Sequence, residues 1–171
     1  FNAISNNFNN LIKIFDKYNP DGIIISTGRT RKIDFDISNF KSCNLVLLNC
    51  WSDNFNGISI LPADYDSTKK AVKSLIKMKK KNIAIIQPIE YEWQGYADRL
   101  SGWRDAHFES NLKINPKLIC RPSKNKKYSS ESENGFEALE KLINKKIKFD
   151  AVFALNDLLA MGCYQAAKEN K

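Results

Sequence analysis

Short apolar runs alternate along this chain with longer stretches of helical periodicity, and this alternation restricts the possible folds more than any other feature. Most runs lack polar–apolar alternation, as expected for parallel strands covered by helices on both faces. The runs occupy residues 22–26, 45–49, 58–61, 82–87, 118–120 and 151–155, and the helical patterns 3–18, 33–41, 67–80, 97–110, 131–147 and 157–169. The order predicts an α/β fold with doubly wound parallel sheets.

The rhythm of strand and helix is interrupted between Cys50 and Pro62, where a polar loop joins two apolar runs without a helix. We interpret this interruption as a boundary between two lobes. The chain of 171 residues is long enough for one domain or for two small lobes. We therefore expect one lobe over residues 1–61 and a second over residues 62–171.

Two of the expected helices have recognisable starts. Asp66 or Ser67 is the expected N-cap of the helix over 67–80, and Asp157 opens the last helix. The first residue is Phe1 rather than Met, and residues 1–10 contain no charged segment, so we expect a piece of a longer protein without an intact secretory signal.

The net charge of +8 raises the question of a nucleic-acid partner. Only five of the 27 basic residues are arginines, the residue type that favours forked contacts with bases and phosphates. Most lysines are therefore expected on solvated helix faces. The run Lys77–Lys81 ends a helical pattern, where cations favour the helix dipole.

Cysteine and histidine usage argues against a metal site. The four cysteines are spaced too widely for zinc, and the single histidine, His107, falls inside a helical pattern. Buried free thiols fit a reducing cytoplasm. No apolar run is long enough to span a membrane. The sequence contains no dinucleotide-binding, Walker or nucleophile–base motif, so we expect neither an enzyme nor a cofactor.

Taken in order, the motifs resemble the effector-binding core of the LacI (lactose-repressor/galactose-repressor) family, which is similar to periplasmic sugar-binding proteins. The resemblance covers essentially the whole chain. The stretches that carry it are Asp21–Ile25, Leu45–Asn49, Asp64–Asp66, Ser74–Ile76, Asn82–Ile86, Arg99–Arg104, Asn134–Ala138 and Ala151–Gly162.

This resemblance implies two α/β lobes that hold a small molecule, a sugar or a nucleobase, between them. It also implies a homodimer and a DNA-binding headpiece outside these residues, through which operator DNA is contacted. The expected function is a small-molecule, most simply sugar, sensing domain of a cytoplasmic transcription regulator. The alternative is a solute-binding protein of a sugar uptake system, and an enzyme of flavodoxin-like type ranks third.

The resemblance also indicates ligand-binding residues. Arg99 begins the motif that holds the family's effector-contacting arginine, and Asn156 matches the family's ligand-contacting asparagine. Asn49 stands where many members carry aspartate. Tyr128 is the nearest ring to the family's stacking aromatic, whose own spacing falls on Ser130.

Chemistry supports the same region, since ligands of open α/β sheets bind beyond the carboxyl ends of strands. Asp157 and Trp93 complete the candidate list, because each follows an apolar run. Simpler interpretations stay open: Asp157 as a plain N-cap, Trp93 as loop packing, Asn156 as a turn residue, and Arg99 as a surface residue paired with Glu90 or Glu92.

The strand over 22–26 is expected to have an open edge. It is β-branched and uncharged, and no strand precedes it in the chain. Such an edge pairs or aggregates unless something covers it. We therefore expect a longer native chain or an intermolecular contact at these residues.

Overall fold

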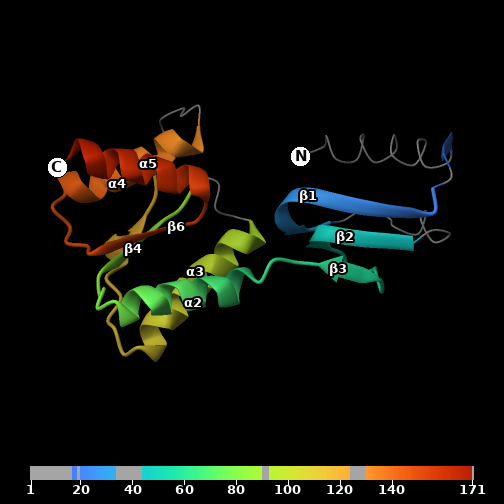
Figure 1. Cartoon of the computed structure of the whole chain (residues 1–171), viewed down its shortest axis with the longest axis horizontal. Coiled ribbons are helices and arrows are strands. Elements are labelled where there is room, and N and C mark those ends of the chain that lie inside the picture. The colour runs from blue at the N-terminus through green and yellow to red at the C-terminus, as the bar shows by residue number, and fades with distance from the viewer. Residues whose placement is uncertain (1–16, 19, 34–43, 90–92, 124–129, 171) are drawn as a thin grey trace. The chain divides into compact units, whose positions relative to one another are not determined.

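The computed structural model describes residues 17–18, 20–33, 44–89, 93–123 and 130–170. The chain divides into two compact units, Phe1–Pro62 and Ala63–Lys171. Each unit contains a parallel sheet of three strands (Figure 1). The prediction of an α/β fold with parallel sheets is therefore confirmed.

Unit 1 is built around strands β1 (Gly22–Lys32), β2 (Asn44–Trp51) and β3 (Ile58–Ile60). β2 lies in the centre and pairs in parallel with both neighbours. Its buried residues Leu47 and Cys50 form a small core with Ile33. Within the described residues β1 pairs with β2 alone, which places it at an edge of the sheet.

β1 is longer than its apolar run indicated. The strand continues past Ser26 through polar residues to Lys32, after an irregularity in its pairing with β2. The hydroxyl of Thr27 stabilises this extension by donating to the carbonyl oxygen of Asn49 at 2.8 Å. The prediction stopped at Ser26 because it followed apolar residues only, whereas an edge strand tolerates polar ones.

Unit 2 contains strands β4 (Ile83–Ile86), β5 (Ile119–Cys120) and β6 (Ala151–Ala154), with β4 in the centre of a parallel sheet. A short 3₁₀ turn, Pro116–Leu118, precedes β5. Helices α2 and α3 cover one face of the sheet, and α4 and α5 cover the other (Figure 1). The helices span α2 (Asp64–Lys77), α3 (Gln94–Glu109), α4 (Glu131–Asn144) and α5 (Asp157–Glu169).

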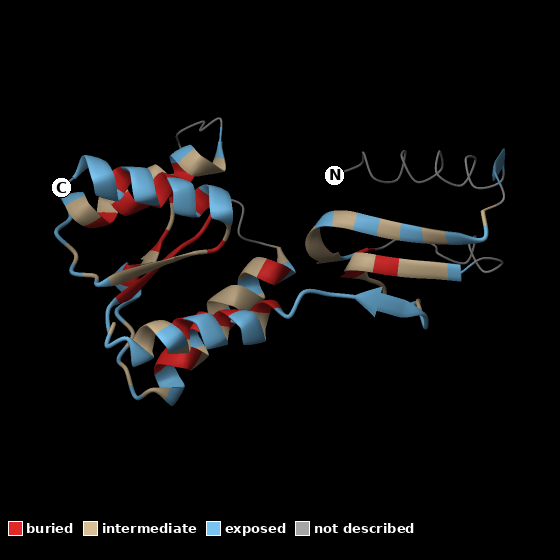
Figure 2. Cartoon of the chain, viewed as in Figure 1, coloured by how far each residue is buried: buried red, intermediate tan, exposed pale blue. Residues whose placement is uncertain are grey.

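The core of unit 2 lies between the sheet and its two helix layers (Figure 2). All four residues of β4 are fully buried, which agrees with a strand of uninterrupted apolar residues covered on both faces. Trp103 of α3 is also fully buried. His107 contacts the Trp103 ring one turn away, and its Nδ1 lies 2.8 Å from the Trp103 carbonyl oxygen. This histidine is therefore part of the core.

Two glycines allow α4 and α5 to approach closely. A Cβ atom at Gly162 of α5 would lie 1.8 Å from the carbonyl oxygen of Ser132, and one at Gly135 of α4 would lie 2.2 Å from that of Leu159. Neither distance is compatible with a side chain. The absence of a side chain at these two positions sets the separation of the helices.

Of the two predicted helix starts, that of α2 is wrong, whereas α5 begins at Asp157 as predicted. α2 begins at Asp64, so Asp66 and Ser67 lie in its first turn, and Ala63 occupies the cap position without a side-chain hydrogen bond. Acidic residues near a helix N-terminus also favour its dipole, which is why Asp66 resembled a cap. α5 is capped by Asn156, and Asp157 is its first helical residue.

The first two predicted helices fall largely outside the described residues. Of the helix over 3–18, only Lys17 and Tyr18 are described, and both are helical. Of the helix over 33–41, only Ile33 is described, and it is not helical. No helix in the described part of the chain is long and apolar enough to cross a membrane.

Candidate functional site

The candidate site in unit 2 lies where β6 ends and the chain enters α5. Leu155 and Asn156 follow β6 directly, and Gln87 follows the central strand β4. Leu155 pairs with the end of β4 through its amide, which donates to the carbonyl oxygen of Ile86 at 3.1 Å. The carboxyl ends of both strands therefore meet at one edge of the sheet, where ligands of α/β proteins bind.

Arg99 reaches this edge from the second turn of α3. Its Nε donates to Asp64 Oδ1 at 2.9 Å, and a terminal nitrogen donates to the carbonyl oxygen of Leu155. The guanidinium also lies over the ring of Tyr96, with its central carbon 5.8 Å from the ring centroid. Arg99 thus joins α2, α3 and the end of β6.

Asp64 supplies the negative charge of this cluster. Its side chain is 6% exposed, whereas that of Arg99 is 29% exposed. Oδ1 accepts from Arg99, while Oδ2 is buried without a hydrogen-bond partner among the described residues. Burial of a carboxylate is costly without a paired cation, and the ion pair with Arg99 offsets this cost for Asp64.

Both the oxygen and the nitrogen of the Asn156 side-chain amide make hydrogen bonds. Its Oδ1 accepts from the backbone N–H of Leu159 at 2.9 Å and so caps α5. Its Nδ2 donates to the hydroxyl of Tyr96 at 3.3 Å and to a carboxylate oxygen of Glu131. The side chain is therefore fixed in one orientation, and it is more than a turn residue.

Glu131 opens α4, and the sequence explains why α4 begins there. Ser130 and Glu133 form a capping box, in which the hydroxyl of Ser130 accepts from the N–H of Glu133 at 3.2 Å and Glu133 Oε2 accepts from the N–H of Ser130 at 3.1 Å. The next residue, Glu131, is thereby placed in the first turn of α4 and reaches Asn156.

The structure brings together two of the six candidate residues named from the sequence, Arg99 and Asn156, through their common neighbour Tyr96. Arg99 is half-buried and pairs with Asp64, so it is not simply a surface helix residue. Asp157 is exposed at the start of α5, and its role as N-cap is taken by Asn156.

Of the remaining three candidates, Trp93 and Asn49 are described. Trp93 is half-buried and caps α3 through its carbonyl oxygen, which accepts from the N–H groups of Tyr96 and Ala97 at 3.0 and 3.2 Å. Asn49 belongs to unit 1, has a positive φ of 60°, and donates from Nδ2 to the Thr27 carbonyl oxygen at 3.3 Å. Tyr128 lies outside the described residues.

Asp64, Tyr96 and Glu131 are the members of the cluster that sequence reasoning did not assign to a site. Tyr96 carried a usable signal, because it lies three residues before Arg99 and hence on the same helix face. Asp64 and Glu131 lie 35 and 32 residues from Arg99 in the sequence. Only the packing of the helices places such residues side by side.

The cluster is suited to binding a polar, uncharged molecule. Two carboxylates, a guanidinium, an amide and a phenol offer donors and acceptors in several directions within a few ångströms. Hydroxyl groups both donate and accept, so a polyhydroxylated ligand matches such a set. The described residues contain no group of three side chains that could hold a metal ion.

Comparison with known families and proteins gives a consistent result. The family described as periplasmic binding proteins and sugar binding domain of LacI family matches residues 6–171. The transcriptional repressor PurR of Pasteurella multocida is 29% identical over 161 residues, which are 94% of this chain and 46% of that protein. Catabolite control protein A of Priestia megaterium is 30% identical over 150 residues, covering 87% and 43%.

Solved structures show the same fold. A sugar-binding transcriptional regulator from Escherichia coli, crystallised with phosphate, superposes with a TM-score of 0.73 at 24% identity, over 94% of this chain and 56% of that one. A regulatory protein from Chloroflexus aggregans gives a TM-score of 0.75 at 21% identity, over 99% and 58%. The chain spans about half the length of the curated relatives that it matches.

Proposed function

Because this chain belongs to the family of periplasmic binding proteins and LacI sugar-binding domains, we propose that it senses a small effector, most simply a sugar, for a transcription regulator. The two compact units would be parts of the two lobes, with the division expected near residue 62. A ligand that binds one arrangement of the lobes better than another shifts the population toward it.

The observation that carries this proposal is the cluster around Arg99. An arginine tied to a buried carboxylate is a fixed donor, and such preorganisation favours recognition of hydroxyl oxygens. Asn156 is held beside it through Tyr96. The relatives support a regulator over an uptake protein, since PurR and the ribose operon repressor of Haemophilus influenzae are named as repressors.

The remaining parts of the proposal concern partners. We expect a homodimer in the cytoplasm that contacts operator DNA through a helix-turn-helix segment not among these residues. Four further residues stay candidates for ligand contact, namely Asn49, Asp157, Trp93 and Tyr128. The reading frame upstream of Phe1 distinguishes the two main functions, because a helix-turn-helix indicates a regulator and a signal peptide indicates uptake.

A thermal-shift screen of the chain against pentoses, hexoses, polyols and nucleobases would identify the ligand class. A ligand at 100 times its Kd stabilises the folded state by about 2.7 kcal/mol, which is readily measured. Stabilisation by a sugar or polyol supports the proposal. Stabilisation by nucleobases alone would contradict a sugar ligand.

Replacing Arg99 by alanine should weaken binding of the identified ligand about 10- to 100-fold, because a charge-assisted hydrogen bond is lost. Isothermal titration provides the measurement. Asp64 would then be buried without its cation, so the double variant Arg99→Ala with Asp64→Asn is needed to restore the fold. Recovery of stability without affinity supports ligand contact by Arg99, whereas recovery of both would remove Arg99 from the site.

A further inference from the structure

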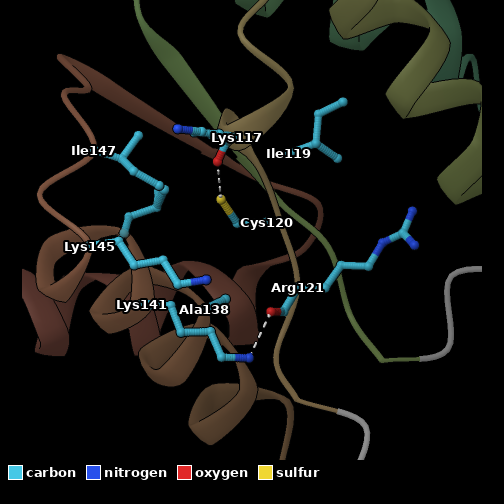
Figure 3. Close-up of a pocket in the computed structure, with 9 residues that line it drawn as sticks. Lys117, Ile119, Cys120, Arg121, Ala138, Lys141, Lys145 and Ile147 are labelled. Atoms are coloured by element: carbon cyan, nitrogen blue, oxygen red, sulfur yellow. Dashed lines mark hydrogen bonds between the residues drawn. The ribbon is translucent and has the colours of Figure 1, made fainter.

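A cavity of about 410 Å³ lies between α4 and β5, and none of its lining residues belongs to the Arg99 cluster. We propose that this cavity binds an organic phosphate, a ligand with a phosphate head group and an apolar body. The proposal does not depend on the effector assigned to the Arg99 cluster. The cavity is lined by three lysines, Lys117, Lys141 and Lys145, and by one arginine, Arg121 (Figure 3).

The positive charge is concentrated on one side of the cavity. Lys141 and Lys145 are one helical turn apart, so they share a face of α4, and in Figure 3 both extend toward β5. Burial raises the pKa of the Cys120 thiol to about 11, and the positive charges of Lys145 and Lys141 lower it in part. Two ammonium groups are therefore directed at the same wall of the cavity.

The charge is only partly compensated. Lys141 pairs with Glu137 at 3.2 Å and donates to the carbonyl oxygen of Arg121 at 3.3 Å. No ion pair within the described ranges involves Lys145 or Lys117, which are both exposed. The helix C-terminus next to Lys145 offsets part of its charge, but a dianionic phosphate offers a stronger partner.

The remaining lining of the cavity is apolar. Ile119, Leu142 and Ile147 contribute side chains, and Cys120 remains a neutral thiol because burial raises its pKa. The volume falls within the range of small-molecule sites. Lysines bind phosphate as point charges, whereas planar carboxylates favour arginine forks. The guanidinium of Arg121 is directed elsewhere, since its Nε donates to Gln87 Oε1 at 2.5 Å.

The test is isothermal titration of the full chain with phenyl phosphate at low salt, compared with inorganic phosphate and with benzoate. Phenyl phosphate should bind about 10-fold more tightly than either, because only it offers both the head group and the apolar body. Lys145→Gln should weaken phenyl phosphate binding about 10-fold through loss of a charge-assisted contact. Lys168→Gln is the matched control, since Lys168 is an exposed lysine in the last turn of α5.

Specific results overturn the proposal. Absence of phenyl phosphate binding at millimolar concentration would contradict the proposed site. Equal binding of benzoate would show that the cavity does not select a phosphate group over a carboxylate. Equal losses in Lys145→Gln and Lys168→Gln would indicate nonspecific charge attraction. Loss of binding in Arg99→Lys, with Lys145→Gln unaffected, would place the phosphate in the Arg99 cluster instead. Failure of the sugar screen would leave each of these outcomes unchanged.

Discussion

Cys50, Cys120 and Cys163 are buried and free, as expected from the sequence. Burial raises the pKa of all three thiols, to about 11 for Cys120 and about 12 for Cys163. A thiol with a pKa near 11 is ionised at about one part in a thousand at pH 8, and only the thiolate is reactive. These cysteines therefore serve as small core residues in the native protein.

In a Cys43→Ser background, we expect the three remaining thiols to react slowly with a disulfide reagent at pH 8 and rapidly after addition of urea. The measurement is absorbance of the released thiol over time. A native rate equal to that of a small free thiol would contradict the burial of these side chains. Because burial raises the pKa of Cys120 to about 11, its native reaction rate should keep rising as the pH increases from 8 toward 11.

The residues of the candidate site were only partly predictable. Arg99 and Asn156 could be found because each belongs to a local motif that the family resemblance identifies. The partners of these residues could not be found, since Asp64 and Glu131 come from other helices and depend on packing for their position. Sequence patterns report local periodicity, but not which side chains meet across the sheet edge.

At the scale of elements, the contact between α4 and α5 offers a direct test. Gly162→Ala should destabilise the protein by about 1–3 kcal/mol, because its Cβ would collide with the backbone of α4. Urea unfolding followed by circular dichroism gives the free energy of unfolding. Gly28→Ala, in β1 of unit 1, is the control for a glycine without crowding, since a Cβ there meets no atom within 4 Å. Similar losses in both variants would show that crowding is not the cause.

The position of β1 at the edge of the described sheet leads to a prediction about hydrogen exchange. Ile24 is 70% exposed, and in the described sheet β1 pairs only with β2. In such an edge strand, amides that point away from β2 should exchange fast and those that point toward it slowly. Exchange measured by NMR at low concentration should thus alternate along 22–26. Slow exchange at every amide in a demonstrated monomer would show that the edge is covered.

Helix and strand positions were predicted better than their boundaries. The strands of unit 2 and its four helices appear where the apolar periodicity placed them, because burial on both faces leaves a strong pattern. The start of α2 was predicted three residues too late, because Ala63 gives no capping signal and the acidic first turn imitates one. The boundary of a helix depends on single residues near its end, whereas its periodicity is repeated over many residues.

At the scale of the whole molecule, the two units differ in the size of their described cores. Among the described residues, the buried core of unit 1 is Ile33, Leu47 and Cys50, whereas that of unit 2 is far more extensive. Burial in a small core stabilises the folded state by little more than the conformational entropy lost on folding. We therefore expect the units to unfold separately, with unit 1 unfolding first.

Native-state hydrogen exchange at increasing urea, followed by mass spectrometry, measures this difference. Peptides that contain β2 should exchange at lower urea than those that contain β4, because β2 is only partly buried and β4 fully buried. Simultaneous exchange of both peptides at all urea concentrations would mean that the units unfold as one cooperative body.

The close approach at Gly135 and Gly162 has a mechanical consequence. Helices whose backbones are in contact cannot slide past one another without a steric clash. We therefore expect α4 and α5 to move together as one rigid layer, a wall of the site. Glu131 and Asn156 stand on opposite sides of that contact, and their hydrogen bond therefore survives any motion of the wall. Adjustment to a bound molecule then falls to the opposite helix layer, where the Arg99 guanidinium donates to Leu155 and the Tyr96 hydroxyl accepts from Asn156.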